Sequence, residues 1–222
     1  MKTLKDLEQF AFTSSTMEAT NLTRAKNLIL STFKTLSHQP KKVLSLNQNW
    51  AAKALEEQGL LIRYYNEIDN TERGFDTVLA LDEATCNFKT ETEQKIGIAN
   101  ILSLVGANGL VLFSLRDYRN GHFHKRPLGD TVVNSIDGEE FVTVEVNKLD
   151  PTDKQAWEQF LYVVKNGSEF YNIPCGDKRT LYFKQLANYC STSGSTGFGV
   201  AKDIYWRGNW RRTPENIIWA KF

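Results

Sequence analysis

The stretch that decides the fold, residues 41–118, opens with KKVLSLNQNWAAKALEEQGLLIRYY at residues 41–65. Along it, apolar runs of strand length occur at Val43 to Leu46, Leu60 to Tyr65, Phe75 to Leu81 and Leu110 to Leu115. Apolar residues have the spacing of a helix at Trp50 to Gln58 and at about Glu91 to Val105. The first of these segments stops at Gly59. Buried strands that alternate with helices predict an α/β fold with a mostly parallel sheet and helices on both faces.

The remaining segments fit around this core. Apolar spacing between Leu4 and Thr35 predicts two amphipathic helices packed on the sheet. Asp130 to Val146 predicts an inserted β-hairpin, with its turn at Asp137 and Gly138. Asp150 and Pro151 predict the start of a helix that runs to about Lys165. A further helix at about Arg179 to Tyr189 and an antiparallel strand pair, Phe198 to Trp206 with Asn216 to Phe222, are expected to close the chain.

These segments predict one domain in four parts. Its 222 residues are enough for one well-buried α/β domain with an insertion, and few for two. The parts are N-terminal helices at 1–39, the α/β core at 40–118, an insertion or lid at 119–178, and a C-terminal helix and strand pair at 179–222.

Composition sets limits on partners and compartment. Lysine and arginine number 27 against 26 acidic residues, so no net field attracts nucleic acid or a membrane, and such binding would have to be local. Three cysteines without a CxxC pair favour a reducing compartment. No leader or membrane-length apolar run is evident, which predicts a soluble, cytoplasmic protein.

The order of these elements resembles a class I S-adenosylmethionine-dependent methyltransferase, a Rossmann-like family. The resemblance rests on Val43 to Leu46 as the first strand, Phe75 to Asp82 as the fourth, and Gly106 to Ser114 as the turn into the fifth. The final helix and strand pair also fit the family's ending. The resemblance implies methyl transfer from S-adenosylmethionine bound at the carboxyl ends of the strands.

Departures from the family's pattern predict a degenerate cofactor loop and a shortened core. The family usually places an acidic residue and a glycine-rich loop after the first strand, where this chain has Ser45, Asn47 and Asn49. The family's second strand usually ends in a carboxylate that holds the ribose; here Asn66 stands there and Glu67 comes one residue late. Between Asn66 and Phe75 the chain is too short for the helix and strand that normally supply the adenine pocket.

The cofactor-binding candidates that follow from the resemblance are Ser45, Asn47, Asn49, Glu67 and Asp82. An alternative explains the same residues without a ligand. Asn47 to Asn49 would then form a polar turn and helix cap, and Asp82 with Glu83 would cap the next helix.

Candidates for substrate contacts or a general base follow the last parallel strand: Arg116, Asp117, Tyr118, His122 and His124. The two histidines have the alternate spacing with which a strand could present both to one metal ion. No third ligand stands nearby in sequence, so we expect no metal, and two ordinary surface histidines are the simpler interpretation.

The C-terminal segment interleaves aromatic and guanidinium side chains at Trp206, Arg207, Trp210, Arg211 and Arg212. Such residues can stack on bases and contact phosphates. They are equally suited to a protein interface, or the tryptophans pack on the chain's own sheet.

Three hypotheses for function remain. The first is S-adenosylmethionine-dependent methyl transfer with an atypical cofactor site. The second is a methyltransferase-like pseudoenzyme, a non-catalytic scaffold or assembly subunit. The third is a nucleic-acid-binding accessory protein that uses the C-terminal Trp/Arg segment.

Overall fold

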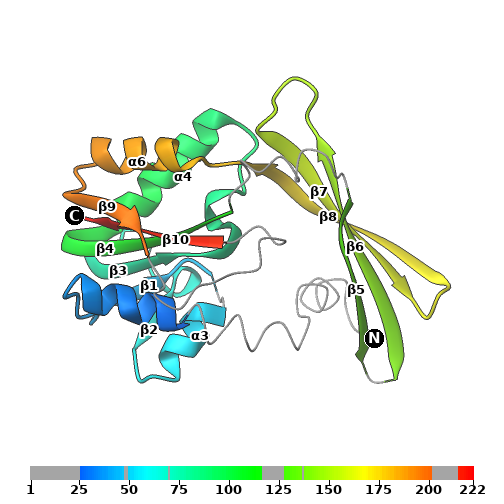
Figure 1. The fold of residues 1–222 in the computed structure, drawn as a ribbon, viewed down its shortest axis with the longest axis horizontal. Helices are drawn as coiled ribbons and strands as arrows, with labels where there is room; N and C mark the ends of the chain where they lie inside the picture. The colour runs from blue at the N-terminus through cyan, green and yellow to red at the C-terminus, as the bar shows by residue number, and fades with distance from the viewer. Residues whose placement is uncertain (1–25, 48–49, 70, 117–127, 137, 202–214) are drawn as a thin grey trace.

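The computed structural model describes residues 26–47, 50–69, 71–116, 128–136, 138–201 and 215–222. Within these ranges the chain forms two separate β-sheets, which lie side by side (Figure 1). The larger sheet carries helices on both faces, whereas the smaller is built from the inserted segment between β4 and α6.

The larger sheet has six strands in the order β2-β1-β3-β4-β10-β9. Their bounds are β1 Val43–Ser45, β2 Ile62–Tyr64, β3 Phe75–Ala80, β4 Val105–Arg116, β9 Gly197–Val200 and β10 Glu215–Lys221. The pairs β1–β2, β1–β3 and β3–β4 are parallel, and β10 runs antiparallel to both β4 and β9. The predicted mostly parallel sheet with an antiparallel C-terminal strand pair is confirmed.

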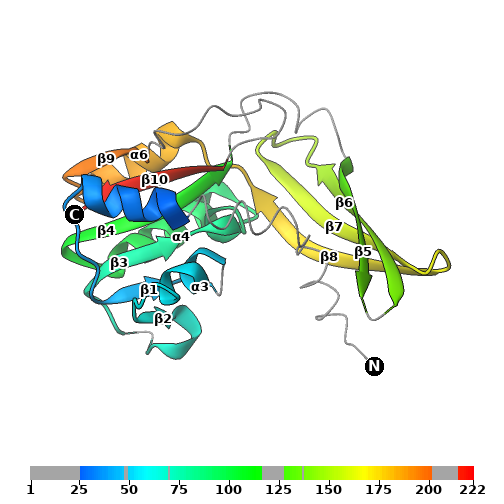
Figure 2. The same ribbon diagram turned by 60° about the horizontal axis from the view of Figure 1, so that its bottom comes forward.

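Helices cover both faces of this sheet, as predicted. A helix over residues 26–35 and α3 (Trp50–Glu56) lie on one face, and α4 (Glu91–Ser103) and α6 (Phe183–Thr192) lie on the other (Figure 1 and Figure 2). Successive residues of β3 point to opposite faces, so Leu79 packs in one core cluster and Val78 and Ala80 in the other. Burial on both sides explains the continuous apolar run at this strand.

The termini of the helices follow from local chemistry. Gly59 has a φ of +83°, a left-handed conformation that glycine adopts without a Cβ clash, and it ends α3. Thr90 Oγ1 accepts the Glu93 N–H at 3.1 Å while the Glu93 carboxylate accepts the Thr90 N–H at 3.2 Å, a capping box that starts α4.

The predicted shortening between the second and third strands of the chain is present. The connection from β2 to β3 consists of a single 3₁₀ turn, η1 (Tyr65–Glu67), and a loop that ends at Gly74. The Arg63 guanidinium forms an ion pair with Glu72 at 2.7 Å and so holds this loop against the edge strand. β2 is therefore the outermost strand on its side of the sheet.

The smaller sheet is an antiparallel meander in the order β5-β6-β7-β8. Its strands are β5 Leu128–Ile136, β6 Glu139–Leu149, β7 Ala156–Lys165 and β8 Glu169–Arg179. The first two form the predicted hairpin, and Gly138 in its turn has a φ of +80°.

The helix predicted from Asp150 to Lys165 is wrong, because residues 156–165 form β7. Leu161 and Val163 are buried while Tyr162 between them is exposed, which is the two-residue period of a strand. Asp150 accepts the backbone N–H groups of Thr152 and Asp153, so it closes a turn instead of capping a helix. The next helix also begins later than predicted, since Arg179 still belongs to β8.

Candidate functional site

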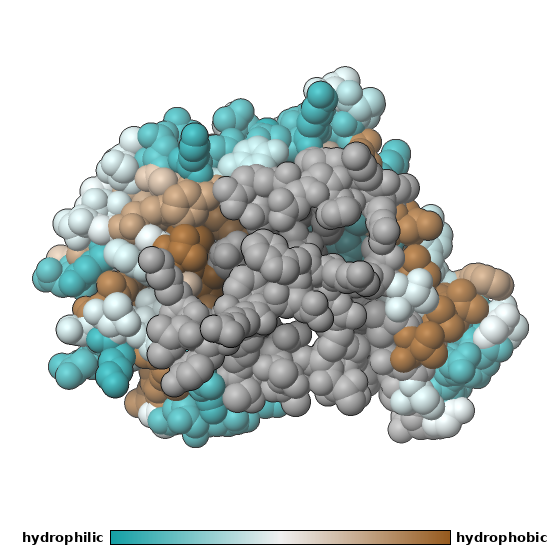
Figure 3. All heavy atoms as spheres, viewed as in Figure 1, coloured by the Kyte–Doolittle hydropathy of each residue, from teal (hydrophilic) through white to brown (hydrophobic). Residues whose placement is uncertain are grey.

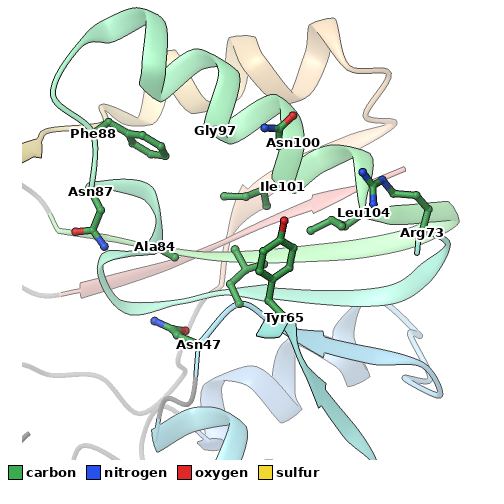
Figure 4. A pocket seen from close by; sticks show the side chains of 11 residues that line it. Asn47, Tyr65, Arg73, Ala84, Asn87, Phe88, Gly97, Asn100, Ile101 and Leu104 are labelled. Atoms are coloured by element: carbon green, nitrogen blue, oxygen red, sulfur yellow. The ribbon is translucent and has the colours of Figure 1, made fainter. Parts of the chain in front are cut away.

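A cavity of about 450 Å³ lies on the face that α4 covers and runs from the carboxyl ends of β1, β2 and β3 to Arg73 before β3 and Leu104 at the end of α4. Leu46 and Asn47 follow β1, Tyr65 follows β2, and Ala84 belongs to η2 (Asp82–Thr85), which follows β3. Gly97 and Asn100 of α4 face these loops across the cavity (Figure 4). Ligands of open α/β sheets bind at this edge, so the cavity is the candidate site.

The walls of the cavity combine amides, aromatic rings and aliphatic side chains. Asn47, Asn87 and Asn100 contribute the amides, and Tyr65 and Phe88 the rings (Figure 4). The aliphatic part comes from Leu46, Ala84, Ile101 and Leu104. Of the described residues that line the cavity, Arg73 is the one with a formal charge at neutral pH.

Hydrogen bonds join the loops after β1 and β3 at the cavity's edge. Ser45, fully buried in β1, donates its hydroxyl to the Asn47 carbonyl at 2.7 Å. The Asn47 side-chain amide donates to the Leu81 carbonyl at 3.5 Å, and the Leu46 N–H donates to the Leu79 carbonyl at 3.1 Å. Ser45 therefore shapes the loop, and Asn47 reaches the cavity.

Asn87 is oriented by a residue from the smaller sheet. Lys178 of β8, only 6% exposed, donates from Nζ to the Asn87 Oδ1 at 2.6 Å. This bond uses the amide oxygen, and Figure 4 shows the amide nitrogen turned toward the cavity. Asn87 thus presents a hydrogen-bond donor to a ligand.

Further bonds fix the two sheets together beside this residue. The Arg179 N–H donates to the Cys86 carbonyl at 2.7 Å. Buried Gln94 of α4 donates from Nε2 to the carbonyls of Thr85 and Thr180, at 3.2 and 3.4 Å. These bonds join the connection after β3, the start of α4 and the end of β8 next to the cavity.

Glu67, the carboxylate that the resemblance suggested for ribose binding, caps its own 3₁₀ turn. Its carboxylate accepts the Tyr64 N–H at 3.1 Å, and it does not line the cavity. Tyr65 lines the cavity instead, with its hydroxyl directed inward (Figure 4). The polar group from the end of β2 is thus a phenol and not a carboxylate.

Of the other predicted residues, the structure describes the backbone of two. The backbone of Asp82 begins η2 after β3, and Arg116 ends β4, where it pairs with Glu215 of β10. The remaining candidates lie outside the described residues: Asn49, Asp117, Tyr118, His122, His124, Trp206, Arg207, Trp210, Arg211 and Arg212.

Sequence reasoning missed Tyr65, Asn87, Phe88 and Asn100. The sequence predicts Tyr65 as the last residue of an apolar strand, and Asn87 and Phe88 follow β3 by several residues. Polar residues just beyond a predicted strand were the available signal. Asn100 had no such signal, because it lies in the middle of a helix.

The buried cysteines provide no activated nucleophile at this site. Burial raises the pKa of the Cys190 thiol to about 12, and Cys86 is 5% exposed. Within the described part of the chain, no three His, Cys, Asp or Glu side chains gather as metal ligands would. The helices described here also lack the combined length and hydropathy of a membrane span.

Comparison with known proteins found no matching family model and no matching curated protein. Solved structures do match over nearly the whole chain. The S-adenosylmethionine-bound amino pentose methyltransferase CalS10 of Micromonospora echinaspora aligns with a TM-score of 0.65 at 8% identity, over 100% of this chain and 98% of its own.

Two further structures agree. The CcbJ methyltransferase of Streptomyces caelestis has a TM-score of 0.63 at 13% identity, over 88% of this chain and 87% of its own. DesVI of Streptomyces venezuelae has a TM-score of 0.60 at 11% identity, over 99% and 98%. With the strand order, the antiparallel β10 and the helices on both faces, these matches show that the chain has the fold of the class I S-adenosylmethionine-dependent methyltransferases.

Proposed function

We propose that the chain is an S-adenosylmethionine-dependent methyltransferase whose cofactor site uses amides and a phenol where the family usually has carboxylates. The observation that carries this proposal is the cavity at the carboxyl ends of β1, β2 and β3, within a methyltransferase fold. Fold alone does not assign a reaction, so the residues of the cavity have to fit the cofactor.

The size of the cavity suits a nucleoside. Its volume of about 450 Å³ lies within the usual range for small-ligand sites, roughly 300–1,000 Å³. Tyr65 and Phe88 approach from opposite walls and provide ring surfaces for a planar base (Figure 4). Ile101 and Leu104 supply the apolar surface that such a base also contacts.

The polar groups suit adenosine in particular. An asparagine amide can pair with the donor and acceptor edge of adenine, and three asparagines line the cavity. Asn87, held by Lys178, offers an N–H to a ring nitrogen or a ribose hydroxyl. The Tyr65 hydroxyl both donates and accepts, which is enough for one ribose hydroxyl, although a carboxylate would accept two.

S-adenosylmethionine would supply a methyl group on a positively charged sulfur, ready for direct displacement. For such a transfer, alignment of the acceptor with the methyl group provides much of the acceleration, and a strong base is not required. Arg116 ends β4 at the same carboxyl edge of the sheet, and the other residues that the sequence suggests for substrate contact come next in the chain. The substrate side of the site is proposed to be there.

Calorimetric titration with S-adenosylmethionine and S-adenosylhomocysteine tests the proposal. We expect micromolar binding by the native chain. Asn87→Asp keeps the side-chain shape and the bond to Lys178 but replaces the donor with a carboxylate oxygen, so affinity should fall at least about tenfold. Tyr65→Phe should weaken binding by a smaller factor, because the ring surface stays.

Asn172→Ala is the matched control, since Asn172 lies on β8 far along the sequence from the cavity residues and does not line it. Its affinity should equal that of the native chain. No heat and no thermal stabilisation at millimolar cofactor would reject the proposal and favour a non-catalytic scaffold. The nucleic-acid hypothesis rests on Trp206 to Arg212, and salt-dependent binding of single-stranded nucleic acid lost in Trp206→Ala would favour it.

A further inference from the structure

Lys178 reaches the edge of the cavity from the smaller sheet, because β8 runs from that sheet back to the core (Figure 1). Lys178 is only 6% exposed, and its Nζ donates to Asn87 Oδ1 at 2.6 Å. Asn87 lines the cavity, whereas Lys178 does not. Lys178 can therefore act on a ligand in the cavity through Asn87.

The chemistry of this bond decides which end of the Asn87 amide faces the cavity. An ammonium group has three donors and no acceptor, so the amide must turn its oxygen toward Lys178. Turning the amide over would set N–H groups against the ammonium and lose a charge-assisted hydrogen bond. That loss disfavours the reversed amide by roughly ten- to hundredfold. The nitrogen is thus held toward the cavity, as Figure 4 shows.

Packing alone would not fix this amide, because Asn87 is an exposed residue. The two orientations of an asparagine amide have nearly the same shape and differ in where they donate and where they accept. Hydrogen bonds to the amide therefore decide between the orientations. Lys178 provides such a bond from a position 91 residues further along the chain.

Contacts on both sides of this bond keep the end of β8 beside the cavity. The Arg179 N–H donates to the Cys86 carbonyl at 2.7 Å. On the other side, Lys89 Nζ lies 3.9 Å from the Asp177 carboxylate, an exposed pair that adds little. Three consecutive residues of β8 therefore contact the connection between η2 and α4.

A donor held in this direction favours a ligand atom that accepts a hydrogen bond. In adenine the ring nitrogens N1, N3 and N7 carry no hydrogen and accept. A reversed amide would present its oxygen, and two acceptors cannot share a hydrogen bond. The orientation set by Lys178 therefore favours a bond from Asn87 to a ring nitrogen of the base, and it penalises a ligand without that nitrogen.

We propose that Lys178 is a positioning residue that, through Asn87, makes the site select a base with an accepting ring nitrogen. This role rests on the proposed function, because the base is that of S-adenosylmethionine. The inserted sheet would then contribute to the selectivity of the cofactor site as well as to the substrate side.

Calorimetric titration of the full chain with S-adenosylhomocysteine and its three deaza analogues measures this selectivity. Each analogue replaces one ring nitrogen, N1, N3 or N7, by C–H and so removes one acceptor. For the native chain, one of the three should bind about tenfold more weakly than S-adenosylhomocysteine itself. We call the ratio of these two dissociation constants the deaza ratio.

Lys178→Gln tests the role of the ammonium. Glutamine has a donor and an acceptor, so it can pair with either end of the Asn87 amide, which can then turn its oxygen toward the C–H of the analogue. The deaza ratio should fall to about threefold or less. Lys178→Met should act in the same direction if the first variant fails to fold, and Lys178→Arg, which keeps a charged donor, should retain most of the ratio. A role in folding alone would weaken the binding of all four ligands by one factor and leave the ratio unchanged.

Two further variants check that the effect passes through Asn87. In Asn87→Asp both side-chain oxygens accept, so the deaza ratio should be lost, and adding Lys178→Gln should not change it further. Lys184→Gln is the matched control, because Lys184 is exposed on α6, and hydrophilic residues gather over α4 and α6 at the top of Figure 3. This control should keep both the affinity and the deaza ratio of the native chain.

The outcomes separate this role from the proposed function. A native chain that binds S-adenosylhomocysteine and all three analogues equally would overturn the role of Lys178 and leave the proposed function intact. A deaza ratio that persists in both Lys178→Gln and Lys178→Met would overturn the role as well. No binding of any of the four ligands would instead reject the proposed function, and the role of Lys178 with it.

Discussion

Tyr65 and Glu67, two residues apart, show how a single turn of backbone decides what reaches the site. The 3₁₀ turn directs the Glu67 carboxylate back to the Tyr64 N–H, while the Tyr65 ring enters the cavity. Within this turn, the Glu67 carboxylate is engaged by the backbone, and Tyr65 is the residue that lines the cavity. The chemistry of the site thus depends on the residue that the turn exposes.

His38 gives the clearest pH-dependent prediction at the level of one residue. Its Nε2 lies 2.7 Å from the hydroxyl of buried Thr77, and burial lowers the pKa of the imidazole although Asp76 opposes that shift. Because this pKa is lower in the folded state, the unfolded chain takes up the proton at a higher pH than the folded chain does. The contribution of neutral His38 to stability is therefore present above the ordinary pKa of about 6.5 and is lost as pH falls through the lower folded value.

Urea unfolding of the native chain and of His38→Gln, at about pH 7.5 and about pH 5.5, tests this. The free energy of unfolding should fall more for the native chain over this interval, because glutamine keeps an N–H donor and does not titrate. Equal decreases in both proteins would show that the imidazole does not contribute to the pH dependence.

At the scale of single elements, β7 shows where local sequence misleads. Asp150 followed by Pro151 is a common helix start, yet the strand period of residues 156–165 and pairing on both sides with β6 and β8 decide the outcome. β7 pairs with the strand before it and the strand after it, so the meander forms from neighbours along the chain. Asp150 and Pro151 do begin a local structure, but that structure is a turn and not a helix.

Helix α4 carries a prediction about the cavity. A Cβ added at Gly97 would lie 2.3 Å from Cε1 and Cζ of the Phe88 ring. Alanine is favoured over glycine within a helix by about 1 kcal/mol, so in Gly97→Ala we expect the ring to move and not the helix. Because Phe88 is a wall of the cavity, affinity for S-adenosylhomocysteine should fall about tenfold while the melting temperature changes by only a few degrees.

Titration and thermal unfolding of Gly97→Ala, with Lys95→Ala as an exposed control on the same helix, separate the two effects. Gly97→Ala combined with Phe88→Leu should recover part of the affinity, since the smaller side chain makes room. Unchanged binding in Gly97→Ala would place the ring outside the ligand's surroundings.

At the scale of the whole molecule, the two sheets are fastened where β8 meets the core. Arg179, 4% exposed, donates its backbone N–H to Cys86 and its guanidinium to Asp153 and Gln155 in the turn before β7. The guanidinium lowers the pKa of the Asp153 carboxyl, whose contribution is thus present above its unfolded pKa of about 3.9 and lost as pH falls through the folded value.

Asp153→Asn should lower the free energy of unfolding by about 2 kcal/mol, less than a fully buried pair because Asp153 is partly exposed. The reason is that the buried Arg179 charge loses its counter-ion. Urea unfolding at neutral pH measures the change, and Glu158→Gln, which breaks an exposed pair with Lys148, should cost less than about 1 kcal/mol. Equally small decreases in the free energy of unfolding in both variants would mean that the pair of Arg179 with Asp153 does not stabilise the junction between β8 and the core.

The sequence by itself determined the methyltransferase-like core, because strands buried on both faces are continuous apolar runs and helices between them have their own spacing and caps. The mostly parallel sheet, the missing unit after β2, the hairpin at Gly138 and the antiparallel C-terminal pair were all readable in this way. The strands, helices and turns themselves each depend on residues close together in the chain.

Only the tertiary structure decided where the cavity lies and which face of the smaller sheet is buried. Asn47, Tyr65, Asn87 and Asn100 are separated by up to 53 positions, and their convergence depends on how parallel strands and α4 pack. Lys178 reaches Asn87 across 91 positions, through a sheet that the sequence had divided between hairpin and helix. The alternation of β7 could place Tyr162 and Leu161 on opposite faces, but which face the rest of the chain covers is settled by long-range packing alone.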